Sequence, residues 1–236
     1  MNPAIIGRAP LGGLYGPDRV LTIASVAAAV LYLASMGTLP EAGNAVVRGF
    51  TCGLLATVAF RCVGRFNGRV LGTALGLCAV GEVLMALDPA GLFGAAVTAY
   101  LAATLLLVLL FLANPAASNR VGTGRQALAA VTLAISPAFA AWLWPALGDL
   151  AVLITVYIVA ISAMAVAALY SRFRFWPTVA GPLLILLADA LLAIDRFLIT
   201  LPAAGAVTWA AAYTGQLLLV IGIAGAALQL APRRIL

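Results

Sequence analysis

The stretch between residues 91 and 112 reads GLFGAAVTAYLAATLLLVLLFL and contains no charged side chain. As one α-helix it is long enough to cross the hydrocarbon core of a bilayer, which needs about 20 apolar residues. Comparable runs recur along the chain between short connectors that contain Pro, Gly or Asn. They predict seven further spans at about 20–39, 43–62, 68–87, 126–145, 150–170, 176–198 and 205–230.

The composition agrees with an all-α integral membrane protein. Of the 236 residues, 65% are hydrophobic and only 8% are charged, whereas about 25% are charged in an average soluble domain. This excludes a soluble enzyme, a disordered chain and a disulfide-stapled secreted module. A transmembrane β-barrel is excluded because its strands would alternate in polarity, and these runs are continuous. We expect one eight-helix domain over 20–230, preceded by a segment 1–19 and followed by a tail 231–236.

The sequence contains no histidine, so neither an imidazole metal site nor histidine acid–base catalysis is available. The three cysteines are expected to be small buried residues, because they lie in or beside apolar runs without a Cys-x-x-Cys pair. They are Cys52, Cys62 and Cys78. We therefore expect no metal and no cofactor.

The arginines predict the orientation of the chain. All thirteen basic residues are arginine, and all but Arg48 and Arg196 fall at one set of span ends or in the terminal segments on the same side. The positive-inside rule places that side, with both termini, in the cytoplasm. This distribution explains the net charge of +6 without a nucleic-acid partner. A composition rich in Ala, Gly and Arg but lacking Lys favours a bacterial plasma membrane. The residues on the predicted inner side are Arg8, Arg19, Arg61, Arg65, Arg69, Arg120, Arg125, Arg172, Arg174, Arg233 and Arg234.

Tryptophans near span ends are typical of an aromatic belt at the membrane interface. On this basis Trp142, Trp144 and Trp209 are expected at the outer interface and Trp176 at the inner one.

The two halves of the chain resemble each other. An acid, five mostly apolar residues and a second acid recur as Glu82 to Asp88 in the third span and Asp189 to Asp195 in the seventh. A tyrosine also recurs in the fourth and eighth spans, as Tyr100 and Tyr213, and each is followed by a similar Leu-rich sequence. Because equivalent spans run in the same direction, this pattern predicts a parallel four-plus-four internal repeat.

Three ionisable residues, Arg48, Glu82 and Asp189, lie inside predicted spans, where charge is costly and commonly functional. By sequence position all three fall within roughly 7–14 Å of the outer boundary. Tyr157, Tyr213 and Gln216 fall somewhat deeper on the same side and are candidate substrate-binding residues together with Arg48. One interpretation is structural, with Arg48 neutralising a carboxylate to hold the bundle together. The other is catalytic, because two carboxyls and one arginine leave one carboxyl free to act as an acid beside an ionised partner.

At these residues the sequence resembles the YhhN-type lysoplasmalogenase family over about residues 20–230. The motifs that carry the resemblance are Gly81-Glu82, Ala188-Asp189 followed by Leu192-Ala193 and Phe197, Tyr157 with Met164, Tyr213-x-x-Gln216, and Arg48 where the family often has lysine. Three positions depart from the family pattern. Glu82 stands where the family has Asp, Ala188 where it has Ser, and Thr104 where many members have His.

The resemblance implies a polytopic membrane hydrolase whose substrate is a lysophospholipid with a vinyl ether bond. It implies that Glu82 and Asp189 carry the chemistry without a metal, and that Arg48, Tyr157, Tyr213 and Gln216 bind or orient the substrate. Membrane lipid is then the surrounding partner. The sequence does not determine which carboxyl is the acid, nor the oligomeric state.

Two other functions remain open at this point. The three departures favour a lipid-binding or lipid-sensing relative without catalysis. The predicted repeat would also suit a small proton-coupled transporter with the carboxyls as a relay. Seven-span zinc hydrolases of the ceramidase type are excluded, because they require histidine ligands.

Overall fold

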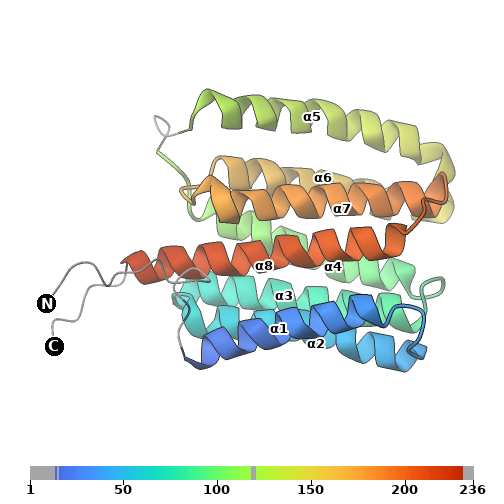
Figure 1. Cartoon of the computed structure of the whole chain (residues 1–236). Coiled ribbons are helices and arrows are strands. Elements are labelled where there is room, and N and C mark those ends of the chain that lie inside the picture. Colours follow the sequence, from blue (N-terminus) through green and yellow to red (C-terminus); the bar gives the residue numbers. More distant parts are fainter. Residues whose placement is uncertain (1–13, 15, 118–120, 231–236) are drawn as a thin grey trace, which may run out of the picture.

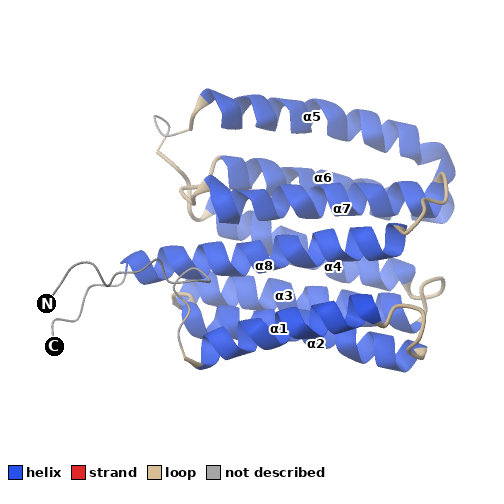
Figure 2. Cartoon of the chain, in the orientation of Figure 1, coloured by secondary structure: helices blue, strands red, loops and turns tan. Residues whose placement is uncertain are grey.

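The computed structural model describes residue 14 and residues 16–117 and 121–230, and within that part of the chain it contains helices and no strand (Figure 2). Eight helices are long and apolar enough to cross a membrane. This confirms the all-α membrane fold predicted from the sequence. The helices are α1 Pro17–Ala34, α2 Glu41–Cys62, α3 Arg65–Leu87, α4 Phe93–Leu112, α5 Thr123–Leu143, α6 Ala151–Leu169, α7 Ala180–Phe197 and α8 Ala204–Leu230.

Most of the predicted boundaries agree with these helices to within a few residues, but the first span was placed wrongly. The run expected to continue to residue 39 ends as α1 at Ala34. A turn follows, in which the Thr38 amide and hydroxyl both donate to the Ser35 carbonyl. Gly37 adopts φ 82° there, a conformation that side chains with a Cβ rarely adopt. The segment Phe175–Val179 precedes α7 and is kinked, because Trp176 has extended backbone angles (φ −103°, ψ 128°).

The helices form a bundle in which chain neighbours pack side by side, except α4 and α5 (Figure 1). Two further contacts close it, since α4 packs on α6 and α8 packs on α2. Helix α5 lies at the outer edge, where it packs mainly against α6. In a four-plus-four repeat, helices α1–α4 correspond to α5–α8. The contact between α2 and α3 then corresponds to that between α6 and α7, and the contact between α4 and α6 corresponds to that between α8 and α2. This is compatible with a four-plus-four repeat, which stays a prediction.

The start of α1 and the end of α8 lie at the same end of the bundle (Figure 1). Loops at that end are tied by polar contacts: the Arg125 guanidinium donates to the carbonyls of Leu169, Ser171 and Phe173. These are carbonyls at and after the end of α6, where a cation is favourable. The predicted charges at Arg8, Arg120, Arg233 and Arg234, and most of the segment 1–19 and all of the tail 231–236, lie outside the described residues.

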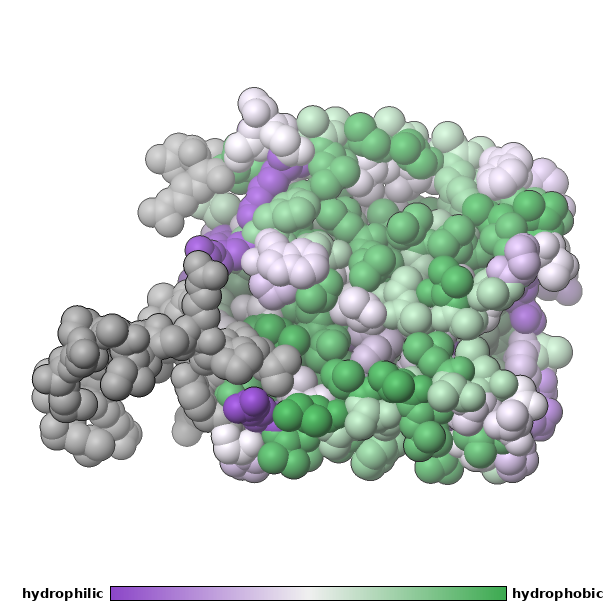
Figure 3. Space-filling view, in the orientation of Figure 1, coloured by the Kyte–Doolittle hydropathy of each residue, from purple (hydrophilic) through white to green (hydrophobic). Residues whose placement is uncertain are grey.

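On the face that Figure 3 shows, apolar side chains cover the side of the bundle, and polar groups gather toward its two ends. Large hydrophobic residues such as Val46, Val152 and Val159 are more than 60% exposed on α2 and α6. Apolar exposure of this extent is expected for a surface that faces lipid. Trp142, Trp144 and Trp176 are also exposed, as the predicted aromatic belt requires.

Candidate functional site

A cavity of about 210 Å³ lies inside the bundle, and we call it the polar cavity because several charged and polar side chains line it. Its walls come from α1, α2, α3, α4, α6, α7 and α8, and residues from the loop ends beyond α1 and α3 lie at one end of it. The structure brings together in this cavity all the predicted site residues except Tyr213. They are Arg48, Glu82, Tyr157, Asp189 and Gln216.

Arg48 on α2 and Glu82 on α3 form an ion pair. The Arg48 Nε and Nη2 atoms both donate to Glu82 Oε2, at 2.7 and 2.6 Å. The two side chains are 17% and 7% exposed, so the pair is largely removed from solvent. The Arg48 guanidinium also lies 5.8 Å from the centre of the Tyr32 ring. This pairing fulfils the structural interpretation of Arg48 for one of the two carboxyls.

Two further donors complete the surroundings of Glu82. The Tyr100 hydroxyl donates to Oε1 and the Trp209 indole N–H donates to Oε2, both at 3.0 Å. Together with Arg48, these groups all donate to the oxygens of the Glu82 carboxyl. Trp209 is only 5% exposed, so its expected place in the aromatic belt was wrong. The indole N–H finds its partner inside the protein and not at the membrane interface.

Asp189 on α7 has different surroundings. The Tyr157 hydroxyl donates to Asp189 Oδ2 at 2.6 Å. No ion pair to Asp189, and no hydrogen bond to its Oδ1, occurs within the described part of the chain. The Oδ1 atom is not fully buried, so it remains accessible to the cavity. Asp189 is therefore the carboxyl with an open oxygen and no cation.

Gln216 on α8 is 5% exposed and accepts a hydrogen bond from the Cys52 thiol, with 3.1 Å between sulfur and Oε1. Its amide nitrogen has no partner among the described residues, so it is available as a donor to a molecule in the cavity. Tyr213 lines neither this cavity nor the apolar cleft described below. Its hydroxyl lies 2.8 Å from that of Ser25, and its ring stacks on Trp209 at 5.5 Å between centroids.

Sequence reasoning missed Trp209 and Tyr100 as parts of the site. A signal for Trp209 was present, because positions 209, 213 and 216 fall on one face of a helix. Tyr100 was noticed only through its likeness to Tyr213, although Tyr100 and not Tyr213 contacts Glu82. Cys78 and Thr104 also line the polar cavity. Cys52 and Cys78 are buried, as expected, whereas Cys62 is only partly so.

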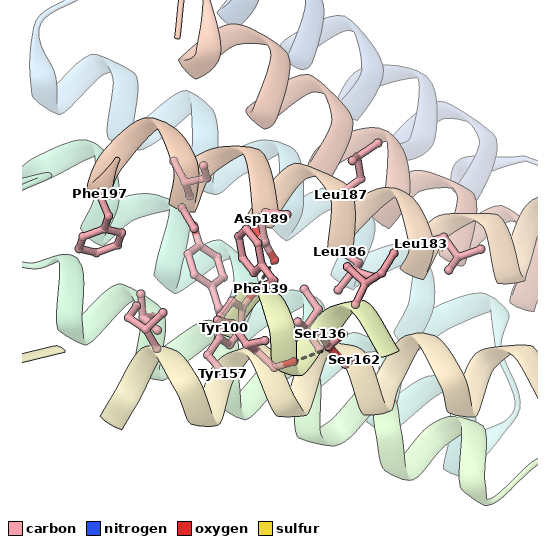
Figure 4. Close-up of a pocket in the computed structure, with 18 of the residues that line it drawn as sticks. Tyr100, Ser136, Phe139, Tyr157, Ser162, Leu183, Leu186, Leu187, Asp189 and Phe197 are labelled. Atoms are coloured by element: carbon pink, nitrogen blue, oxygen red, sulfur yellow. Dashed lines mark hydrogen bonds between the residues drawn. The ribbon is translucent and has the colours of Figure 1, made fainter. Parts of the chain in front are cut away.

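Asp189 also borders a second cavity, an apolar cleft of about 260 Å³ between α5, α6 and α7 (Figure 4). The two cavities share a wall, so that Asp189 and Tyr157 face a polar space on one side and an apolar space on the other. Figure 4 shows Asp189 and Tyr157 close together beside this cleft, joined by their hydrogen bond.

The model of the YhhN family matches residues 43–223 of the chain. The protein belongs to the YhhN family. Similar proteins include those named lysoplasmalogenase in Mycobacterium bovis and Mycobacterium tuberculosis, each 34% identical over 176 residues, which cover 72% of this chain. This YhhN family member matches 65% of the length of those relatives, just under two thirds. No solved structure matches the chain significantly.

Proposed function

We propose that this protein is a lysoplasmalogenase, which hydrolyses the vinyl ether bond of a lysoplasmalogen to a fatty aldehyde and a glycerophospho head group. The observation that carries the proposal is the asymmetry of the two intramembrane carboxyls. Glu82 is neutralised by Arg48, whereas Asp189 has no cation and an open oxygen. The name of the mycobacterial relatives supports the same reaction. The enzyme acts in a bacterial plasma membrane, which the composition rich in Ala, Gly and Arg favours, and the arginines predict that both termini are in the cytoplasm.

In the proposed reaction Asp189 is the general acid. Because Tyr157 donates to Oδ2, a neutral Asp189 carries its proton on Oδ1, the oxygen open to the cavity. That proton passes to the vinyl carbon farther from the ether oxygen, and the electron pair of the double bond forms the new C–H bond. The ether oxygen stabilises the resulting cation as an oxocarbenium ion.

Water then adds to the carbon that bears the ether oxygen. The Asp189 carboxylate takes a proton from that water, which restores the acid and leaves a hemiacetal. Cleavage of the hemiacetal C–O bond gives the aldehyde and moves one proton to the glycerol oxygen. One carboxyl therefore acts first as acid and then as base, as in other hydrolyses through an oxocarbenium ion.

Glu82 supplies a fixed negative charge that stabilises the cationic intermediate. Its bonds to Arg48 leave Nη1 of the guanidinium without a partner among the described residues, so Arg48 can bind the substrate phosphate through that nitrogen. The free amide nitrogen of Gln216 orients water or the glycerol hydroxyl. Tyr213 acts indirectly, by stacking on the Trp209 ring that donates to Glu82.

The test uses purified full-length protein with lysoplasmenylethanolamine and follows aldehyde through a coupled alcohol dehydrogenase. The analogue with a saturated ether chain is the substrate control, because it has no double bond to protonate. We expect turnover of the vinyl ether alone, and a loss of at least about 100-fold in Asp189→Asn. Full turnover in Asp189→Asn would refute the mechanism.

The Glu82→Asp variant restores the acid that the family usually has at this position. It keeps the charge but moves the carboxylate by about an ångström, a displacement large enough to change the rate up to a hundredfold. Faster turnover in Glu82→Asp would show that the longer side chain is a handicap. Lipid binding without turnover in every variant would favour a catalytically silent relative, and uptake driven by a proton gradient would favour a transporter.

A further inference from the structure

The cleft beside Asp189 has walls of strongly apolar character. Helices α5, α6 and α7 supply most of its lining, and side chains such as Ile158, Ile161, Leu183 and Leu186 dominate it. The two serines in its lining bond to each other, with 2.6 Å between the Ser162 and Ser136 hydroxyl oxygens. They therefore present little free polarity. A space of this kind suits a hydrocarbon group and disfavours water.

The cleft is open toward the side of the bundle, between α5 and α7. Ile135 on α5 and Leu187 on α7 both line it, yet they are 59% and 55% exposed. Helix α5 packs mainly on α6, which leaves room for an opening between α5 and α7. Because these side chains face the hydrocarbon of the bilayer, the opening connects the cleft to lipid tails and not to water.

One end of the cleft is closed by aromatic side chains. Phe93 and Phe197 pack edge to face, with 5.8 Å between their ring centres. The Arg196 guanidinium lies over the Phe93 ring at 4.0 Å from its centroid. From Asp189 the free path therefore runs the other way, toward Leu183 and Leu186 and the middle of the membrane (Figure 4).

The cleft meets the polar cavity at the lone carboxyl. Met85, Tyr100, Tyr157, Asp189 and Leu192 line both spaces. A ligand that lies across this wall has an apolar part in the cleft and a polar part near Arg48. A lysophospholipid has this form, with one chain and one head group. A lipid with two chains would need a second apolar space at the same junction.

We infer that the cleft holds the single aliphatic chain of the lysophospholipid, which enters from the bilayer between α5 and α7. The inference rests on the proposed function for the identity of the lipid. The chain extends from Asp189 past Leu186 and Leu183, which places its first carbons and the ether oxygen at the open oxygen of Asp189. Ile135 and Leu187 border the entrance and control access to it.

The experiment maps the chain with a photoreactive lysophospholipid. The probe has a saturated ether chain, which is not hydrolysed, and a diazirine at the chain end. Full-length protein in lipid nanodiscs is irradiated with it, and the modified residues are identified by mass spectrometry. We expect the modification on the cleft-lining residues of α5, α6 and α7, with competition by unlabelled lysophospholipid and none by diacyl phospholipid. Modification of α1 or α2, equal modification of all lipid-facing helices, or competition by diacyl phospholipid would overturn the inference.

Two variants on α5 provide a matched pair. Ile135→Trp narrows the entrance, whereas Leu133→Trp adds the same bulk at a residue that is 58% exposed and lines neither cavity. We expect about tenfold less cleft modification in Ile135→Trp, because the indole would keep about two methylene groups of the lipid chain out of the cleft. We expect no change in Leu133→Trp. Equal behaviour of the two variants would contradict an entrance at Ile135.

Because the readout needs no turnover, the two proposals can fail separately. Cleft modification in a protein that releases no aldehyde would leave the chain site standing and refute the hydrolysis. Aldehyde release by a protein that is modified elsewhere would refute only the chain site.

Discussion

At the scale of single residues, the two intramembrane carboxyls differ in the groups that contact them. Glu82 accepts bonds from Arg48, Tyr100 and Trp209, whereas Asp189 accepts one from Tyr157. The sequence predicted that these charges share one level of the membrane, because residue depth follows from position in a helix. It could not predict which of the two carboxyls forms the ion pair with Arg48, since that depends on how α2, α3 and α7 are rotated about their axes.

Removing the hydroxyl of Tyr157 or of Tyr100 tests this difference between Asp189 and Glu82. Tyr157→Phe removes the one donor to Asp189, whereas Tyr100→Phe removes one of several donors to Glu82. We expect kcat to fall by about tenfold or more in Tyr157→Phe, because the acid loses its orientation, with little change in KM. Tyr100→Phe is the matched control and is expected to retain most of its kcat. A greater loss of kcat in Tyr100→Phe would assign the acid to Glu82.

The ion pair predicts non-additive effects on stability. Arg48→Gln and Glu82→Gln each leave a buried charge without its partner, so each is expected to lower the free energy of unfolding by roughly 3 kcal/mol. The double variant has no unpaired charge and is expected to lose less than the sum of the two. Unfolding in a denaturing detergent gives the three values. Simple additivity would show that the contact contributes nothing.

At the scale of helices, close packing depends on small residues that periodicity alone does not distinguish from other apolar ones. A Cβ at Gly181 of α7 would lie 2.6 Å from the Gly215 carbonyl oxygen of α8, and a Cβ at Gly215 would lie 2.7 Å from that of Gly181. Both helices were predictable from their apolar runs, but this crossing was not. Contact between backbones at the crossing sets where Asp189 lies relative to Gln216, because they lie on these two helices.

Gly181→Ala is therefore expected to destabilise the protein, by about 1–3 kcal/mol, because backbone atoms of α8 have to move. Gly76→Ala on α3 is the control, since a Cβ there meets nothing within 4 Å. It is expected to be neutral or to add up to about 1 kcal/mol, as alanine is the better helix former. Unfolding in a denaturing detergent measures both. Equal loss of stability in the two variants would argue against the close crossing of α7 and α8.

At the scale of the whole molecule, the eight helices were predictable because a membrane requires long apolar runs with internally paired backbone groups. The two cavities were not, since they arise where α5 and α7 stand apart and where polar side chains of distant helices meet. The end of α1 was also not predicted, because the mostly apolar sequence continues past Ala34 through the turn at Gly37. Periodicity and hydropathy report on one helix at a time, whereas cavities depend on several.

The orientation in the membrane is testable with single cysteines in opposite loops. Asp149→Cys lies in a connector predicted to be outside, and Arg172→Cys lies in one predicted to be inside. A membrane-impermeant maleimide added to intact bacterial cells is expected to label the first variant and not the second. The unsubstituted protein, with Cys52 and Cys78 buried, gives the background. The reverse labelling pattern would invert the proposed topology.

The central claim is that a carboxyl fixed in the cavity protonates the vinyl ether carbon. The measurement that tests it most directly is hydrolysis of lysoplasmenylethanolamine in D₂O, with the aldehyde reduced at once by alcohol dehydrogenase and the product analysed for deuterium. We predict one deuterium on the carbon next to the former aldehyde carbon, added to a single face, because Asp189 lies on one side of the chain. Absence of deuterium at that carbon, or equal addition to both faces, would contradict this mechanism.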